Sequence, residues 1–309
     1  MPLTPAARLP EALYPQPGSL RYGLFNVAPP QVIAPSFDDE NLPDHAFGSG
    51  IFYDPVGCGT AHLYPIDCDP PVEKDFDANS GEVQVDPFVV YSTLVCGTPG
   101  SRVQYYADKT ARRLLCSEQH AVEEALWTGS AGNGPFITDP AGPYGAPTDV
   151  GGGGAFASIV DAVAALEQHA YATVPYGYAA HLHATPAVAA YAAAEHQIVT
   201  AGHGFAAVWG TATSEPMLRT PQGSKWVFGG GYPGTGPAGA APGAGQTYIW
   251  VTGLVTTWRD QIWTPPDPLR SQYDRVNNQL NLIAERRYLA TFDCFHAYAL
   301  VDIPIAAVP

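Results

Sequence analysis

The sequence predicts an α+β fold in which one long helix lies across a sheet that the end of the chain completes. Two patterns support this prediction. Apolar residues recur at helical spacing over residues 101–127, and they alternate with other residues over residues 279–303. A helical stripe marks a helix face that packs against a neighbour, whereas a two-residue period marks strands with one buried face.

The long helix has clear predicted ends. Ser101 follows the turn-forming run Gly97–Gly100 and is a favourable N-cap, and Gly129 stops the helix. A helix of this length is a rod of roughly 40 Å. The apolar stripe comprises Val103, Ala107, Ala111, Leu114, Leu115, Ala121, Val122, Ala125 and Leu126, and the charged residues expected largely off it are Arg102, Asp108, Arg112, Glu118 and Glu123.

The C-terminal run predicts strands with a bend between the first two. The polar stretch Ala284–Arg287 interrupts the apolar alternation, and we expect the bend there. The alternating apolar positions are Leu280 and Leu282, then Tyr288, Ala290 and Phe292, then Phe295, Ala297, Ala299 and Val301.

The rest of the chain predicts shorter elements and long connections. Residues 1–50 are rich in proline and lack periodicity, which favours an extended arm. Residues 51–86 favour a hairpin or a long loop. Further strands are expected at 83–95, with Pro87 at an edge or bulge, and at 178–183, 205–213, 226–228 and 248–258, with helices at 156–171 and 185–196 and loops at 130–150 and 229–245.

Composition and charge narrow the range of functions. The chain has 309 residues, enough for one large domain or two ordinary ones. Its formal net charge is −15, with 14 Lys and Arg against 29 Asp and Glu. Sequence-specific nucleic-acid binding needs a basic footprint, so this charge argues against it. A wall that encloses DNA without gripping it is compatible with the same charge.

The cysteines favour thiols over a disulfide framework. There are five of them and no CxxC pair. An odd number at ordinary density is typical of buried thiols in a protein folded in a reducing cytoplasm. Cys58 and Cys68 flank a short stretch with glycine and proline and are the only pair that merits a check. The sequence shows neither a secretory signal peptide nor an apolar run long enough to span a bilayer.

Two histidines are the strongest candidates for chemistry. His181 and His183 lie on a predicted strand, where a spacing of two puts both imidazoles on one face, as a zinc site requires. His196 and His203 follow downstream, and Glu195 is the only nearby acid before Glu215. No third ligand or general base has a fixed spacing to the pair, so ordinary strand histidines are the favoured interpretation. A metal-dependent enzyme built on His181 and His183 stays open as the alternative.

Other motifs indicate structure and no catalysis. The run Gly151–Gly154 lacks the lysine and Ser/Thr of a phosphate-binding loop, and a hinge is expected there. There is no GxSxG nucleophile motif. Asp139, Asp149 and Asp161 are expected to cap helices, form turns or be solvated. The sequence therefore assigns no catalytic, cofactor-binding or metal-binding residue.

The order of these elements resembles the major capsid protein of tailed bacteriophages, the HK97-type fold. The local similarity lies in Asn281–Val301, which looks like the terminal strands of that family, and in Ala121–Pro135, which looks like its helix end and glycine-bearing exit. The resemblance covers the whole chain in order. It implies an N-terminal arm at 1–50, an E-loop hairpin at 51–86, a peripheral domain with the spine helix at 87–129, an axial domain at 130–247 and a return to the peripheral domain at 248–309.

The resemblance implies a structural subunit without catalysis. Such subunits form hexamers and pentamers of an icosahedral shell around double-stranded DNA, so the chain would be part of a virion assembled in the cytoplasm of a bacterial host. Scaffolding, portal and decoration functions would belong to separate proteins, because no scaffold-like segment precedes the arm. The same fold builds encapsulins, protein-filled nanocompartments, which are a second alternative. We expect the arm to become ordered only on neighbouring subunits.

Lysine chemistry bears on one family property. Some viral shells join lysine to asparagine between subunits, and Lys74 lies near Asn79. The other lysines are Lys109 and Lys225. This scarcity argues against covalent cross-links, and a solvated charge is the favoured interpretation of Lys74.

Overall fold

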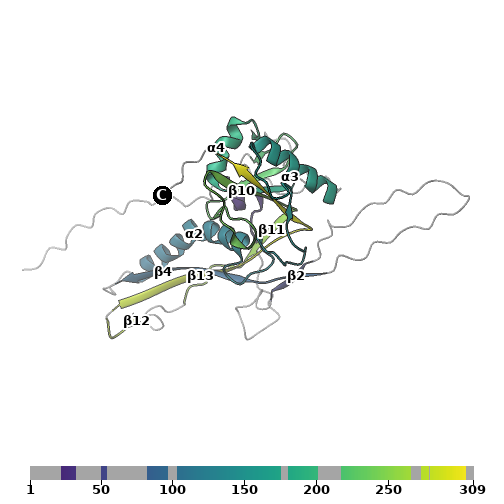
Figure 1. The fold of residues 1–309 in the computed structure, drawn as a ribbon. Coiled ribbons are helices and arrows are strands. Elements are labelled where there is room, and N and C mark those ends of the chain that lie inside the picture. Colours follow the sequence, from purple (N-terminus) through teal and green to yellow (C-terminus); the bar gives the residue numbers. More distant parts are fainter. Residues whose placement is uncertain are drawn as a thin grey trace, which may run out of the picture.

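The structure is a computed structural model that combines two large sheets and a two-stranded one with one long helix and several shorter ones (Figure 1). Its α+β character confirms the predicted fold class. The residues described are 22–32, 50–53, 82–96, 103–174, 180–200, 217–265, 273–277 and 279–303.

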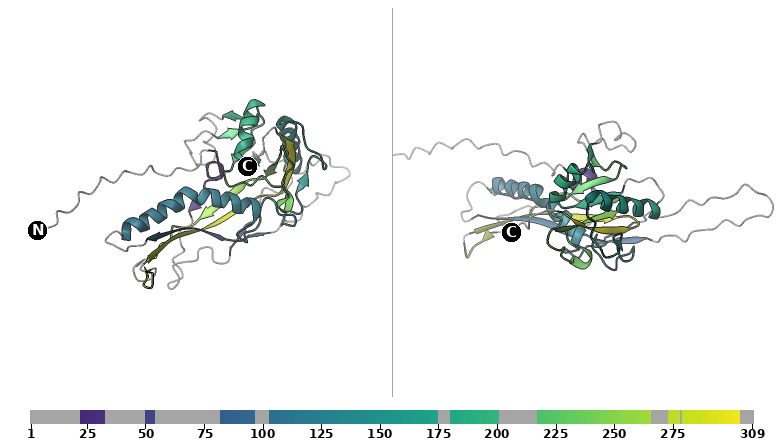
Figure 2. Two further views of the ribbon diagram at one scale, coloured as in Figure 1. Left: turned by 60° about the vertical axis from the view of Figure 1, so that its left-hand side comes forward. Right: turned by 45° about the horizontal axis from the view of Figure 1, so that its top comes forward.

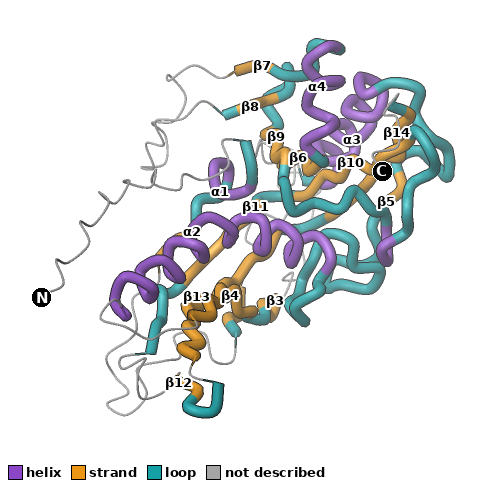
Figure 3. The backbone as a smooth tube through the Cα atoms, turned by 90° about the vertical axis from the view of Figure 1, so that its left-hand side faces the viewer, coloured by secondary structure: helices purple, strands orange, loops and turns teal. Residues whose placement is uncertain are grey.

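The first sheet is built along one long strand, β13 (Gln279–Phe292). The strand β4 (Phe88–Cys96) pairs antiparallel with β13 over most of its length. The other side of β13 is shared by β11 (Val255–Arg259) and β12 (Tyr273–Asp274), and β1 (Gln31–Val32) pairs parallel with β11. The helix α2 (Val103–Thr128) lies across this sheet and contacts both β13 and β4 (Figure 3). This is the helix-on-sheet arrangement that the sequence predicts.

The buried face of α2 differs in part from the prediction. Leu114, Val122 and Leu126 are buried as expected, but Leu115 is 38% exposed. Successive helical residues point about 100° apart, so Leu114 and Leu115 cannot both face one sheet. Glu118 and Glu123 were expected off the buried face, and both are buried.

The predicted bend in the terminal strands is wrong. β13 runs without interruption through residues 284–287, and its inward face continues there. The interruption in the apolar pattern is Arg286, which faces inward and finds a carboxylate on α2. The buried side chains at every second position are Leu280, Leu282, Ala284, Arg286, Tyr288, Ala290 and Phe292.

The second sheet has seven strands in the order β5-β14-β10-β6-β9-β8-β7. The helices α3 (Ile159–Thr173) and α4 (Pro186–Ala194) share a hydrophobic core with it, at the end of the molecule away from β12 (Figures 1 and 2). The strands are β5 (Thr148–Asp149), β6 (His181–Ala184), β7 (Val199–Thr200), β8 (Leu218–Arg219), β9 (Lys225–Phe228), β10 (Gln246–Thr252) and β14 (His296–Asp302), and a 3₁₀ turn lies at Pro237–Gly239.

Two adjacent crossings connect the sheets. The single strand predicted at 248–258 is two strands, because the chain leaves β10 at Gly253 and enters β11 in the first sheet. The return from β13 to β14 passes beside it, and the amide of Asp293 donates to the carbonyl of Leu254 at 3.0 Å. A Cβ at Gly253 would lie 2.4 Å from the carbonyl oxygen of Asp293. The close approach of the two crossings therefore requires glycine at position 253.

Part of the predicted arm is folded on its own chain. All four residues of α1 (Leu24–Val27) are buried, and the amide of Phe228 donates to the carbonyl of Tyr22 at 2.9 Å. The hydroxyl of Thr257 donates to the carbonyl of Ala28 at 2.8 Å. The expectation that residues 1–50 are ordered only by neighbours is therefore wrong for residues 22–28. Residues 1–21 and 33–49 lie outside the described part.

The predicted hairpin is described only at its base. β2 (Ile51–Tyr53) pairs antiparallel with β3 (Val83–Val85), and the connecting residues 54–81 lie outside the described part. Val85 and Leu289 form a small separate core with Ile51 and Trp258. This ribbon therefore covers one end of the β13 face that points away from α2. The strand predicted at 205–213 also lies outside the described residues.

The two adjacent leucines of α2 provide a matched test of this packing. We expect Leu114→Ala to lower the free energy of unfolding by about 2–5 kcal/mol, because it removes a fully buried side chain and leaves a cavity. Leu115→Ala should change it by no more than about 0.5 kcal/mol. Urea denaturation of both variants measures this. Equal losses would mean that the rotation of α2 is different.

Candidate functional site

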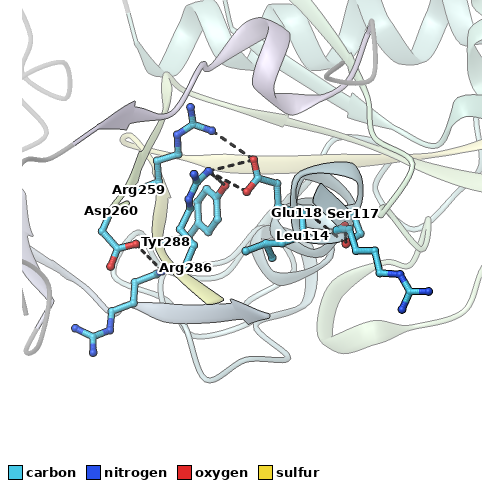
Figure 4. A network of polar contacts seen from close by, with 9 residues as sticks. Leu114, Ser117, Glu118, Arg259, Asp260, Arg286 and Tyr288 are labelled. Atoms are coloured by element: carbon cyan, nitrogen blue, oxygen red, sulfur yellow. Dashed lines mark hydrogen bonds and ion pairs between the residues drawn. The ribbon is translucent and has the colours of Figure 1, made fainter. Parts of the chain in front are cut away.

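The polar centre of the molecule lies between α2 and β13, where Glu118 and Arg286 form an ion pair (Figure 4). Arg286 Nη1 lies 2.9 Å from Oε2 and 3.2 Å from Oε1 of Glu118. Arg259 Nη1, from β11, lies 3.4 Å from Oε1 of the same carboxylate. The side chains of Arg286 and Glu118 are 9% and 6% exposed. One carboxylate therefore joins the helix to two strands of the sheet.

The environment of Tyr288 shows how strongly this region is shielded from water. Its ring stacks between Phe25 and Phe88, with centroid distances of 5.9 and 6.1 Å. Burial, and next the negative charge of Glu118, raise the pKa of Tyr288 to about 12. The site carries two cations and one anion but no group set up for proton transfer near neutral pH. Its arrangement is suited to fixing α2 on the sheet.

A second buried carboxylate anchors the N-terminal segment. Glu123 accepts hydrogen bonds from the amide of Leu24 at 2.9 Å, the amide of Gly231 at 3.0 Å and the side chain of Gln119 at 2.8 Å. Burial raises the pKa of Glu123, and these hydrogen bonds oppose that rise. A Cβ at Gly231 would lie 2.0 Å from the carbonyl of His120, so the chain needs glycine to approach α2 this closely. Glu123 thus ties three distant segments together.

His183 is a core residue with both ring nitrogens occupied. Its Nδ1 lies 2.9 Å from the Tyr232 hydroxyl and its Nε2 lies 2.9 Å from Thr252 Oγ1. The Thr252 hydroxyl donates to the carbonyl of Gly253 at 3.0 Å. Thr252 therefore accepts from Nε2, and the Tyr232 hydroxyl donates to Nδ1. Neither nitrogen keeps a lone pair for a metal ion. Burial lowers the pKa of His183 to about 3.

The proposed third partners of a metal site lie elsewhere. His181 is fully buried beside His183, with ring centroids 6.4 Å apart, and its Nδ1 lies 3.1 Å from the carbonyl of Gly253. Glu195 accepts from the amide of Val160 at 3.0 Å, at the start of α3. His203 lies outside the described residues. Among those that are described, no three His, Cys, Asp or Glu side chains gather as a metal site requires.

The acidic residues predicted as turn formers and caps have those roles. Asp139 accepts from the amide of Ala141 at 2.9 Å, and Ser158 caps α3 by accepting from the amide of Asp161 at 3.1 Å. Asp149 accepts from Gly151 at 2.9 Å and from Gly153 at 2.7 Å. The run Gly151–Gly154 is therefore a turn closed on Asp149.

The cysteine prediction is wrong at one position. Cys294 forms a disulfide. Cys116 is an exposed thiol on α2. Cys58, Cys68, Lys74 and Asn79 all lie outside the described part of the chain.

The face of β4 that points away from α2 carries three exposed large apolar side chains. Phe88 and Val90 point into the core, and the alternate residues Val89, Tyr91 and Val95 are 48%, 64% and 58% exposed. Thr93 lies between Tyr91 and Val95 in this row, and the β13 residues paired with the three apolar ones are Arg287, Glu285 and Asn281, so the row is a narrow apolar strip with a polar rim. Within the described residues, no helix has the length and apolar character needed to cross a membrane.

Structures similar to this chain are protein shells. The capsid of an empty GTA particle aligns with a TM-score of 0.47 and 14% identity, covering 96% of each chain. The capsid of Ralstonia phage GP4 aligns with a TM-score of 0.46 and 12% identity, covering 100% of this chain and 99% of that one. The holo-SrpI encapsulin complex from Synechococcus elongatus PCC 7942 gives 0.38 and 11%, covering 72% and 75%.

No protein-family model matches the chain, and no curated protein does. The structural similarities concern the fold at low sequence identity, and they assign no role to any residue. Phage capsids and one encapsulin complex are what this chain is similar to over most of its length.

The buried ion pair can be tested by removing one partner. Arg286→Met leaves Glu118 with the longer contact to Arg259 and the hydrogen bond of the Tyr288 hydroxyl, and we expect it to lower the free energy of unfolding by about 3–5 kcal/mol. Adding Glu118→Leu should restore most of this loss, because the unpaired charge is then gone. Glu124→Leu, on the exposed side of α2, is the control and should give no rescue. Chemical denaturation in a double-mutant cycle measures the coupling, and additive losses would contradict it.

The buried imidazole predicts a pH effect with a definite sign. Folded His183 resists protonation down to about pH 3, whereas the unfolded chain takes up this proton near pH 6.5. Its contribution to stability is therefore complete above about pH 6.5 and is lost as the pH falls toward 3. We expect His183→Gln to flatten the stability profile between pH 6 and 4 by up to about 1.4 kcal/mol per pH unit. His120→Gln, exposed on α2, is the control. An unchanged slope in His183→Gln would contradict the neutral imidazole.

Proposed function

We propose that this chain is the structural subunit of an icosahedral viral capsid that encloses double-stranded DNA. The observation that carries the proposal is the uncovered apolar row of Val89, Tyr91 and Val95 on the sheet beside α2. Other copies of the chain would cover this row. The lone subunit leaves apolar surface in water, and repeated contacts around closed symmetry bury it.

The shape of the described part supports a building block. α2, β4 and β13 form a long frame that projects from the second sheet with its helices (Figures 1 and 3). Two buried carboxylates fix the helix and the N-terminal segment to that frame. A frame held in this way transmits force between neighbours without bending at the place where the sequence suggested a break.

The division of the chain follows the same proposal. Residues 1–50 would supply an arm, 51–86 an E-loop, 87–129 and 248–309 the peripheral domain, and 130–247 the axial domain. Hexamers and pentamers of this subunit would form the shell in the cytoplasm of a bacterial host, with separate scaffolding, portal and decoration proteins. The two sheets support a division into two connected parts, but β10 and β14 pair with strands of residues 130–247, so within 248–309 the first sheet takes residues 255–292.

Charge supports a wall that holds DNA loosely. The chain carries 14 basic residues against 29 acidic ones, a net charge of −15. Each phosphate that a protein neutralises adds salt-sensitive affinity, so an acidic lining leaves packed DNA free to slide and exit. The described site chemistry also favours a non-catalytic role, since its buried charges and imidazoles hold segments together.

Particle formation tests the proposal directly. We expect the purified protein to form closed particles of megadalton size in electron micrographs and to leave duplex DNA unretarded at physiological salt. Tyr91→Asp should reduce particle yield by tenfold or more while the subunit stays folded by circular dichroism, because it places a charge in the apolar row. Val160→Asp, at a 41% exposed position of α3, is the control.

Two results would contradict this proposal. One is a wild-type protein that stays a small oligomer at high concentration. The other is strong, salt-sensitive binding of DNA by the free subunit. Particles filled with protein and free of DNA would identify a nanocompartment shell instead of a viral capsid.

A further inference from the structure

Three cationic or imidazole side chains lie side by side on the second sheet. His181 of β6 is paired with Lys225 of β9, and Lys225 is paired with Arg219 of β8. Directly paired residues project from the same face of a sheet. The neighbouring residues Leu182 and Trp226 pack with α3 and α4. The row His181–Lys225–Arg219 therefore lies on the opposite face of the sheet.

This row lacks the partners that such groups require. His181 Nε2 and Arg219 Nε are buried without a hydrogen-bond partner. Arg219 makes one contact through Nη1, to the carbonyl of Gly223 at 3.0 Å. The ion pairs found in the described part of the chain both use Glu118, so no carboxylate there is paired with Lys225 or Arg219. Buried polar groups are nearly always satisfied, which makes these two neighbouring unsatisfied atoms informative.

The groups of the row also act on one another. Burial, and next the charge of Arg219, lower the pKa of Lys225 to about 8. Burial lowers the pKa of His181 well below its usual value, and the charges of Lys225, His183 and Arg219 lower it further. Like charges this close are unfavourable unless an anion lies among them. Within the described part of the isolated subunit, these positive charges therefore lack a neutralising anion.

We propose that His181, Lys225 and Arg219 form a receptor for an oxyanion, and that its ligand is an Asp or Glu carboxylate of a second copy of this chain. The proposal rests on the assembly proposed above and names one contact within it. Each copy carries 29 Asp and Glu residues against 14 basic ones, so carboxylates are the groups that neighbours present most often. Lys225 and Arg219 are each partly exposed, so the carboxylate would bind at these two side chains.

A carboxylate suits the row better than a DNA backbone does. Lys225 and Arg219 are only partly exposed, so a slender carboxylate side chain fits beside them more readily than a duplex does, while His181 Nε2 stays covered. The carboxylate would accept from the Lys225 ammonium and the Arg219 guanidinium. Neutral His181 donates from Nδ1 to Gly253, which leaves a lone pair on Nε2. The bound anion would favour transfer of one proton from solvent to that lone pair, so binding should strengthen as the pH falls.

The test measures the reactivity of Lys225 toward acetylation by mass spectrometry, with Lys109 of α2 as the internal reference. In the dispersed subunit at pH 8 and low anion concentration, Lys225 should react readily, because a large share of it is neutral. Acetate, or inorganic phosphate, should slow its reaction by about tenfold or more, since a paired ammonium holds its proton. The assembled particle should show the same slowing without any added anion. Arg219→Met should weaken protection by acetate and by assembly.

The outcomes separate the ligand sources and the two proposals. If neither acetate nor phosphate nor assembly slows the reaction of Lys225 relative to Lys109, there is no oxyanion receptor. Protection by phosphate or by duplex DNA but not by assembly would overturn the carboxylate of a second copy. If the protein forms no particles, the proposed function fails, and protection of the dispersed subunit by acetate still decides whether the receptor exists. Lys225→Met should lower particle yield in folded protein, whereas Lys109→Met should not.

Discussion

The contact on which the rest of the structure depends is the ion pair between Glu118 of α2 and Arg286 of β13. An arginine on the inward face of a strand would normally end that face. Here the carboxylate of the helix neutralises it, so β13 continues to Phe292 and supports β4 on one side and β11 on the other. A buried charge pair is weak as a source of net stability, but its partners must meet in one register. It therefore fixes where along the sheet the helix lies.

The second constraint is the double crossing between the sheets. β10 of the second sheet continues into β11 of the first at Gly253. β13 of the first sheet continues into β14 of the second at residues 293–295, so the chain crosses between the two sheets twice. The crossings touch through their backbones, which leaves no room for a side chain at Gly253. Two chain crossings at one place therefore join the second sheet to the frame formed by α2 and β13. A subunit built in this way can present surfaces on both parts while keeping them in fixed relation.

Local sequence patterns predicted most helices and strands. Several failed predictions concern residues whose partners lie far away in the sequence. The helix stripe and the alternation over 279–303 gave the helix, the terminal strands and the fold class, because both follow from burial of one face. The failures at residues 284–287 and at Glu118 have one cause, whereas Leu115 is exposed because adjacent helical residues point about 100° apart. Arg286 and Glu118 are 168 residues apart, and the sequence around either residue gives no signal that identifies the other as its partner.

The candidate sites show the same limit. The sequence correctly placed His181 and His183 on one strand, but only the structure shows that Tyr232 and Thr252 occupy both nitrogens of His183. The burial of α1 was missed because its contacts with Glu123 and Phe228 come from distant segments. The exposure of Val89, Tyr91 and Val95 on β4 was not predicted either, because a strand pattern alone does not show which face of a strand stays uncovered.

Hydrogen exchange along β13 tests the central claim most directly. If Glu118 and Arg286 hold one continuous strand under the helix, the amides of residues 284–287 that pair with β4 and Trp263 should exchange as slowly as those of residues 288–292 in the dispersed subunit. They should also lose protection together with the amides of α2 as denaturant is added. Fast exchange confined to residues 284–287, with slow exchange on either side, would show a flexible break there and would contradict the account.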